Sequence, residues 1–275
     1  SCRKSIARRL SMDRRKFLGS ALASGALAAA ASSRATEAQE SSASAERQYY
    51  ELRRYHILSG PMKQLADSYF KDALVPALNR LGIKPVGVFS TSIGAQGPSS
   101  YVLMPAAKSE TLVTAERRLL DDAEYQKAAA AFLNAPARDP GAVRMESSLL
   151  YAFESMPKLT PPPAGPRVIE MRTYESTTMQ DHIRKVEMMN SGEGAIFKKS
   201  NIWTIFMGDR LIGPRQPGLT YMISFPSLAD RDKDWAAFFG SPEWKALTSN
   251  PRYSFEPIVS NVDNEILTPA SYSQI

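Results

Sequence analysis

Two short stretches of the chain carry the same reactive side chains in the same order. YYELRRYHI at 49–57 and VIEMRTYES at 168–176 each contain a glutamate, an arginine and a tyrosine spaced two apart. An arginine can hold an anionic group through parallel hydrogen bonds, while a carboxylate and a phenol orient it. The pattern therefore predicts a polar ligand site. Its candidate residues are Glu51, Arg53 and Tyr55, and, each 119 positions later, Glu170, Arg172 and Tyr174.

Alternation along a strand places these three side chains on one face. Successive strand residues point to opposite faces, so Glu51, Arg53 and Tyr55 lie opposite Leu52. The apolar Leu52 side suits packing on helices, so we expect the Glu-Arg-Tyr face to point into the interior of the fold or its mouth. The alternative is structural, a Glu–Arg pair in each half that fixes how the two sheets meet. Repetition favours this alternative, because a contact that stabilises the fold is needed in both halves, whereas an asymmetric active site is needed only once.

Three further side chains are candidates for contact with a ligand. His56 ends the first motif, where the second motif has Glu175. His182 lies at helical spacing from Met179, and a histidine in this setting is more often a hydrogen-bonded core or boundary residue than a ligand. Trp203 opens a predicted strand and could line the interior, although a core role is favoured.

The sequence predicts no metal site and no bound cofactor. It contains no HxxxH or HxxE spacing, no G-x-S-x-G elbow, no P-loop and no Rossmann glycine run. Its single cysteine, Cys2, lies in the N-terminal segment. A thiolate metal site or thiol nucleophile is therefore not expected in the mature chain.

The elements that must position these residues follow the order β-α-β-β-α-β in each half. In the first half we expect strands at 49–57, 85–93, 100–105 and 142–153, with helices at 61–81 and 109–133. Pro76 predicts a kink in the first helix. In the second half, Thr178 and Asp181 form a predicted capping box. Three more landmarks recur in order: 92–104 and 211–224, 122–128 and 241–247, and 144–150 and 261–267.

This pattern predicts an α+β fold built from two ferredoxin-like repeats. One face of each sheet carries helices and the other needs a cover, so we expect the two sheets to pack face to face as an intramolecular barrel. The predicted segments are an N-terminal extension and signal peptide (1–35), a flexible leader (36–48), a first repeat (49–155), a Pro-rich linker (156–166) and a second repeat (167–270).

The net charge of +6 belongs to the N-terminus. Residues 1–35 hold eight of the 34 basic residues and one of the 28 acidic ones, so 36–275 carries 26 basic and 27 acidic residues. This balance argues against a nucleic-acid partner. Arg14-Arg15 before an Ala-rich apolar run at 17–31 resembles a twin-arginine signal, which predicts export to the periplasm or outside the cell. The alternative is a membrane anchor, for which the run is short; we expect no transmembrane segment after cleavage.

The motifs together resemble the NIPSNAP family of the dimeric α/β-barrel superfamily. YELRRYHI and IEMRTYES resemble its opening strand, PVGVFSTSIG its hairpin strand, SPEWKAL its second helix, and RMESSLL and DNEIL its closing strand. The second half departs from the pattern, since 197–208 reads FKKSNIWTIFMG without the Pro-Val-Gly entry. The two halves are therefore expected to contribute unequally to any pocket. Arg54-Tyr55-His56 against Thr173-Tyr174-Glu175 is one such difference.

The resemblance implies a binding or interaction module rather than a defined reaction. Family members are associated with membrane trafficking and with organelle and protein interactions. Our first hypothesis is a module that holds a small ligand between its sheets or binds a protein partner, with further homo-oligomerisation open. The second hypothesis is an enzyme of the cofactor-independent monooxygenase type. Some superfamily members bind haem through a helix histidine, which would be His182 here. The NIPSNAP pattern requires no such ligand.

Overall fold

The computed structural model describes residues 46–58 and 60–275. The chain divides into two units, Ser1–Ser44 and Ala45–Ile275, and the second unit contains every element described below. The predicted signal peptide and nearly all of the predicted flexible leader lie outside the described residues.

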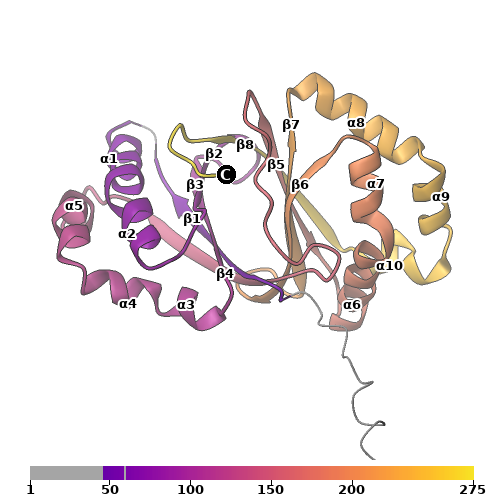
Figure 1. Ribbon diagram of the computed structural model, residues 1–275, viewed down its shortest axis with the longest axis horizontal. Coiled ribbons are helices and arrows are strands. Elements are labelled where there is room, and N and C mark those ends of the chain that lie inside the picture. Colours follow the sequence, from indigo (N-terminus) through magenta and orange to yellow (C-terminus); the bar gives the residue numbers. More distant parts are fainter. Residues whose placement is uncertain (1–45, 59) are drawn as a thin grey trace, which may run out of the picture. The chain divides into compact units, whose positions relative to one another are not determined.

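Strands form the centre of the second unit (Figure 1). They are β1 (Tyr49–His56), β2 (Gly87–Ile93), β3 (Ser99–Ala106), β4 (Arg144–Ala152), β5 (Val168–Glu175), β6 (Trp203–Ile212), β7 (Gly218–Phe225) and β8 (Asn261–Pro269). Nearly every residue of β3 and every residue of β7 is buried. Side chains alternate between the two faces of a strand, and here helices cover one face while the barrel encloses the other.

The strands close into an antiparallel barrel in the order β1-β3-β2-β8-β5-β7-β6-β4. The barrel expected from the sequence is therefore confirmed. The two four-stranded halves face each other across the interior and also hydrogen-bond to each other along both edges. β2 pairs with β8, with Phe89 opposite Pro269, and β4 pairs with β6, with Tyr151 opposite Asp209. Closure removes the free strand edges that an open sheet would expose.

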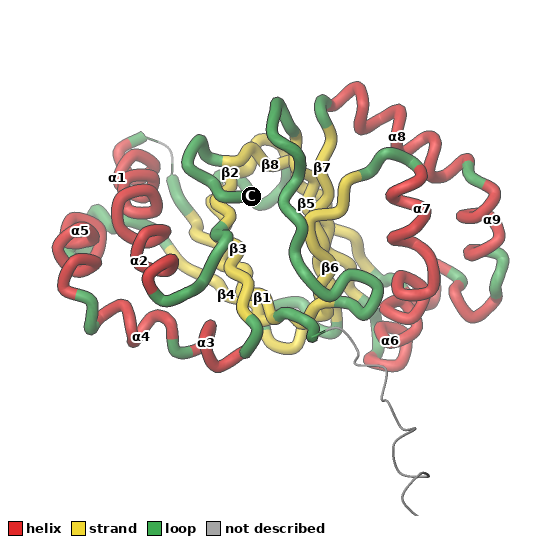
Figure 2. Tube along the Cα trace, viewed as in Figure 1, coloured by secondary structure: helices red, strands yellow, loops and turns green. Residues whose placement is uncertain are grey.

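Helices flank the strands on both outer sides (Figure 2). The first half carries α1 (Pro61–Tyr69), the π-helical turn η1 (Phe70–Leu74), α2 (Val75–Arg80), α3 (Ser109–Val113), α4 (Ala115–Leu120) and α5 (Ala123–Leu133). The second half carries α6 (Met179–Met188), the π-helical turn η2 (Met189–Glu193), α7 (Gly194–Lys199), α8 (Leu228–Gly240), α9 (Pro242–Thr248), the 3-10 turn η3 (Pro251–Tyr253) and α10 (Phe255–Ile258). None of the helices in this part of the chain combines the length and apolar character needed to cross a bilayer.

Two predicted helices differ in detail from the structure. The kink expected at Pro76 is accommodated by η1, where the wider turn lies just before a residue that cannot donate a backbone hydrogen bond. The single helix expected over 109–133 is three segments. It breaks before Ala123 because Asp122 adopts an extended conformation and its side chain accepts a hydrogen bond from the backbone N–H of Tyr125.

Three apolar clusters make up the core. One lies between the strands and helices of the first half and includes Tyr55 and Met104. A second lies in the corresponding place in the other half and includes Tyr221. The third fills the barrel interior with side chains from both halves, among them Leu52 and Met171. Both faces of the central strands are thus buried.

Candidate functional site

The Glu-Arg-Tyr faces point outward beneath the helices, so the predicted orientation is wrong. Tyr55 packs edge-on against Phe70 of η1, with 4.9 Å between ring centroids. Arg53 reaches Glu116 of α4 at 2.7 Å. The side expected to pack on helices, which carries Leu52, instead lies in the barrel interior. Alternation correctly grouped the side chains, but the helices bury the polar face as completely as the barrel buries the apolar one.

In the first half this outward face forms a paired polar network beside a cavity of about 260 Å³. Arg53 is buried and its Nε donates to Glu51 Oε1 at 2.6 Å. Ser147 of β4 donates to the same carboxylate at 2.8 Å, and Glu116 completes the pairing of the guanidinium. Few donors remain for a ligand.

The second half carries a larger version of the network around Glu170, whose side chain is fully buried. It accepts hydrogen bonds from Arg172 (2.9 Å), from Arg231 of α8 (2.6 Å) and from the Trp235 indole N–H (2.9 Å). Burial alone would raise the pKa of Glu170, but the hydrogen bonds from Arg231 and Trp235 and the charge of Arg172 outweigh it and hold that pKa below its ordinary value. Tyr174 joins the network through its hydroxyl, which accepts a hydrogen bond from Arg172 Nε at 3.3 Å.

These two networks tie the first strand of each half to the helices that cover it. Their carboxylates and guanidinium groups are paired, and they occur in both halves. The geometry therefore favours the structural interpretation for Glu51, Arg53 and Tyr55, and for Glu170, Arg172 and Tyr174.

The remaining candidates lie in three different places. His56 faces Glu146 of β4, with 3.2 Å between Nε2 and Oε2. His182 is buried in α6, and its Nε2 is 2.7 Å from Asp209 of β6. Trp203 is 39% exposed, and its indole donates to the carbonyl of Thr160 in the connecting segment. The expectation of an interior or core role for Trp203 is therefore wrong.

The surroundings of His182 do not fit a haem ligand. Its Nε2 is taken by the carboxylate of Asp209, its Nδ1 has no partner but is buried, and the ring is enclosed between helix and sheet. An axial ligand needs a nitrogen directed at open space for the iron and porphyrin. Among residues 46–58 and 60–275, no group of three or more His, Cys, Asp or Glu side chains could hold a metal ion.

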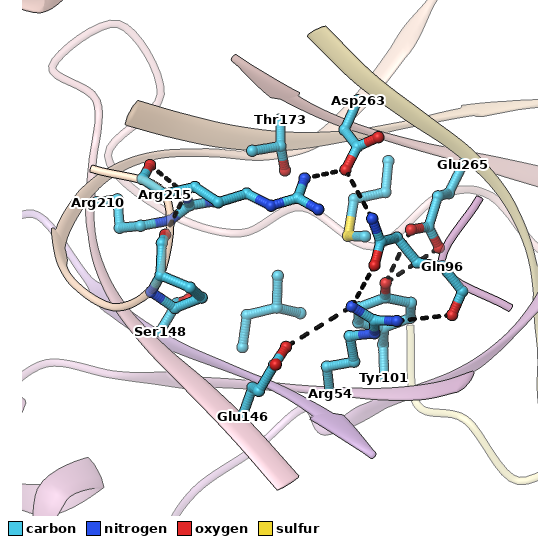
Figure 3. A pocket seen from close by; sticks show the side chains of 13 residues that line it. Arg54, Gln96, Tyr101, Glu146, Ser148, Thr173, Arg210, Arg215, Asp263 and Glu265 are labelled. Atoms are coloured by element: carbon cyan, nitrogen blue, oxygen red, sulfur yellow. Dashed lines mark hydrogen bonds and ion pairs between the residues drawn. The ribbon is translucent and has the colours of Figure 1, made fainter. Parts of the chain in front are cut away.

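A polar cavity of about 70 Å³ lies in the barrel on the face opposite the Glu-Arg-Tyr networks (Figure 3). It lies at the end of the barrel where the β2–β3 turn (94–98) and the β6–β7 turn (213–217) meet the strands. Leu52 and Met171 supply apolar wall. The ionisable side chains that line it are Arg54, Tyr101, Glu146, Arg210, Arg215, Asp263 and Glu265.

The two turns are linked across the barrel end by Asp263 of β8. Arg215 of the β6–β7 turn forms an ion pair with Asp263, and Gln96 of the β2–β3 turn donates to the same carboxylate at 3.3 Å. Arg54 in turn donates to the backbone carbonyl of Gln96 at 2.7 Å and lies 3.6 Å from Glu146. Most of the charged groups at the barrel mouth are thus paired with one another.

Arg210 of β6 differs from the other arginines of the cavity. Its side chain is buried, with the residue only 7% exposed, yet none of the ion pairs among the described residues includes it. Its guanidinium donates to the backbone carbonyls of Pro214 (2.8 Å) and Arg215 (2.9 Å) and to Thr220 Oγ1 (2.7 Å), while Nε has no partner. Burial lowers the pKa of Arg210 to about 10, against the opposing charge of Glu175, so the group stays cationic at neutral pH.

Glu265 of β8 is a carboxyl group that lines the same cavity and has no cationic partner among the described residues. It is 2% exposed, accepts from the Tyr101 hydroxyl at 3.0 Å and from Thr91 at 3.2 Å, and forms no ion pair with a described residue. Burial raises the pKa of Glu265, although the hydrogen bonds from Tyr101 and Thr91 act in the opposite direction. Burial and the nearby Glu265 carboxylate raise the pKa of Tyr101, so its hydroxyl remains a donor.

Sequence reasoning missed Arg210, Glu265 and Tyr101. They are separated by up to 164 positions and carry no local motif. The one available signal was the difference between the two halves, and it did identify Arg54 against Thr173. Both of those residues line the cavity.

The fold is of the dimeric α/β-barrel type. A proposed monooxygenase from Lactobacillus acidophilus superposes with a TM-score of 0.55 at 12% identity, covering 82% of this chain and 94% of that one. Another from Fusobacterium nucleatum gives 0.53 at 7% identity, covering 82% and 93%. At these identities the likeness shows the fold alone.

Residues 169–274 match the NIPSNAP family model, which places the family resemblance in the second half. An uncharacterised NIPSNAP-like domain protein from Burkholderia xenovorans is similar to the chain at 22% identity. The match covers 40% of this chain and 90% of that one, with a TM-score of 0.35. No curated protein matches the chain.

Proposed function

We propose that the protein binds a small organic anion in the cavity of its barrel. The observation that carries this proposal is Arg210, a buried cation that lines the cavity without a carboxylate partner and with an unpartnered Nε. A buried charge of this kind is costly unless something neutralises it. A carboxylate ligand would supply the opposite charge.

The dimensions of the cavity favour a small ligand. A volume of about 70 Å³ holds only a few water-sized groups, since one water needs roughly 10–15 Å³ measured in this way. Leu52 and Met171 offer apolar wall beside the charged side chains. A short-chain carboxylate matches both the size and the mixed lining.

Titration calorimetry with sodium pyruvate and sodium acetate tests the proposal, with sodium chloride as the matched salt. Wild-type protein should bind at least one of the two carboxylates. Arg210→Met should weaken binding on the order of ten- to a hundredfold, because a hydrogen bond to a charged group contributes about 1.5–3 kcal/mol. The control is Arg252→Met, which removes an exposed arginine paired with Glu187. No binding by wild type, or equal binding by the Arg210 variant, would refute the proposal.

An enzyme that uses the same cavity is the second candidate. The observation that favours it is the contact between Glu265 and Tyr101, a carboxyl and a phenol that both line the cavity. Two proteins of similar fold are named as proposed monooxygenases, which supports an enzymatic role by analogy only. Oxygen consumption in the presence of a bound ligand would distinguish this chemistry from simple binding.

We further propose that the two halves are ferredoxin-like repeats produced by tandem duplication. Support comes from strand pairing, because Arg54 lies opposite Tyr101 and Glu146 while Thr173 occupies the corresponding place opposite Thr220 and Asp263. A NIPSNAP family match to the first half, at residues equivalent to 169–274, would test this.

Export by the twin-arginine route is proposed from Arg14-Arg15 and the apolar run that follows. Cell fractionation tests it. Wild-type protein should be found outside the cytoplasm and shortened at its N-terminus, and replacing both arginines by lysine should retain it inside. Correct export of the double-lysine variant would refute the proposal.

A further inference from the structure

The interior of the barrel differs between its two halves at corresponding positions. Strand register defines the correspondence, since Arg54 lies opposite Tyr101 just as Thr173 lies opposite Thr220. The first half therefore has an arginine and a tyrosine at two interior positions where the second half has threonines.

Two more corresponding pairs show the reverse assignment. Ser148 lies opposite Leu52, and Glu265 holds the same place opposite Met171. Thr91 lies opposite Leu267, and Arg210 holds the same place opposite Leu150. Here the second half carries the ionisable side chain and the first half the small hydroxyl.

The outward networks do not diverge in this way. The Glu-Arg-Tyr series is present in both halves and is paired in both. A feature that holds helices on a sheet is needed wherever there is a sheet, whereas a site for one ligand is needed once. Four interior positions, each with a large ionisable group in one half and a small hydroxyl in the other, together make one asymmetric polar site.

Charge pairing leaves two groups of this site free for a ligand. Arg54 lies near Glu146, and Arg215 pairs with Asp263. Arg210 and Glu265 remain without an ion-pair partner among the described residues, and Figure 3 shows them on opposite sides of the cavity. A molecule bound between them would meet a cation at one end and a carboxyl at the other.

We propose that this site enolises a small 2-oxo carboxylate, with Arg210 holding the carboxylate, Glu265 acting as general base and Tyr101 as hydrogen-bond donor to the keto oxygen. The proposal deepens the anion-binding function above and rests on it. A general base must reach the proton it removes, and a donor must meet the oxygen where negative charge develops. In the free protein the Tyr101 hydroxyl donates to Glu265 Oε1 at 3.0 Å, and with a ligand bound it would turn to the keto oxygen, which leaves the carboxylate beside the neighbouring carbon.

The reaction balances without an oxidant or a second substrate. The Glu265 carboxylate forms an O–H bond with a proton from the carbon next to the ketone, and the C–H electron pair becomes the enolate. The Tyr101 hydroxyl donates to the enolate oxygen, and the charge of Arg54 stabilises it. Return of the proton from Glu265 to carbon restores the ketone. When the proton on the Glu265 carboxyl exchanges with a solvent proton before this return, the carbon takes up a proton from solvent and the ketone is recovered otherwise unchanged.

Pyruvate in deuterium oxide is the probe. Proton NMR follows loss of its methyl signal as deuterium replaces hydrogen, and calorimetry of the same samples follows binding. Wild-type protein should accelerate exchange over buffer. Glu265→Gln should bind pyruvate with little change but slow exchange on the order of a hundredfold or more, the usual range for removing a general base. Arg210→Met should raise KM, Tyr101→Phe should lower kcat, and the surface variant Glu243→Gln should match wild type.

The two proposals fail in different ways. If pyruvate binds but wild-type protein does not accelerate exchange, or if Glu265→Gln exchanges as fast as wild type, the enolisation is refuted and anion binding stands. If pyruvate does not bind while acetate does, the 2-oxo acid assignment is refuted. If neither binds, both proposals fall. Should Glu265→Gln not fold, Tyr101→Phe must still lower kcat without raising KM.

Discussion

Two buried glutamates of this protein should respond in opposite ways to the same substitution. Glu170 is held by three donor side chains beneath the helices, whereas Glu265 faces the cavity with only hydroxyl partners. Replacing either by glutamine keeps the shape and removes the charge. Glu170→Gln should strongly destabilise the fold, and Glu265→Gln should leave it unchanged or stabilise it.

The magnitudes follow from the partners that each substitution leaves behind. Glu170→Gln leaves Arg172 without a carboxylate partner and leaves Arg231 with only the exposed Asp232. Breaking a buried pair from one side costs about 3–5 kcal/mol, and we take about 3 because water screens the side chain of Arg231, which is 22% exposed. At about 2–4 °C per kcal/mol for a domain of this size, Tm should fall by roughly 6–12 °C. Glu265→Gln strands no cation, so relief of a buried carboxyl should give a gain of at most about 2 kcal/mol.

Differential scanning calorimetry at pH 7, backed by urea unfolding, measures both variants. Glu243→Gln is the control, since that carboxylate pairs with Lys199 at the surface and its loss should barely change Tm. An equal loss of stability in the two variants would refute the distinction between a structural network and a functional cavity. So would a Tm for Glu170→Gln within 2 °C of wild type, a shift below the roughly 6 °C expected.

Three further predictions concern stability. The pKa of Glu170 is lowered in the folded state, so the ionised carboxylate stabilises the fold fully above the unfolded pKa of about 4.3 and this stabilisation is lost as pH falls through the folded pKa. The urea midpoints at pH 7 and pH 3 should therefore differ less in Glu170→Gln than in wild type. Lys185→Met leaves the buried Glu193 without its partner at 3.0 Å and should lower the free energy of unfolding by about 3–5 kcal/mol, measured by urea unfolding. The double variant Lys185→Met/Glu193→Leu should recover most of this loss. Failure of the double variant to recover would contradict the pairing. Ser241→Ala removes the side-chain acceptor for the Trp244 backbone N–H at the start of α9 and should cost about 1 kcal/mol, with Ser241→Thr as the conservative control in thermal unfolding.

The sequence by itself determined the elements and their order. Period-two alternation marked the strands, helical spacing marked the helix at 61–81, and recurring landmarks placed the same elements in the second half. These are local signals, because backbone geometry and short-range hydrogen bonding act over a few residues. The need to cover the second face of each sheet was then sufficient to predict a barrel.

Only the tertiary structure decided which face of each strand lies inside. Alternation separates the two faces of a strand but does not show which face points into the barrel. Here both faces are buried, one by helices and the other by barrel closure. Polarity did not decide the matter, because Arg53 and Glu170 find partners on the helices and are as well satisfied there as in a cavity. The cavity itself depends on register. Tyr101, Arg210 and Glu265 are brought together by the pairing of β1, β2, β5 and β4 with their neighbours, and no local pattern in the sequence encodes that proximity.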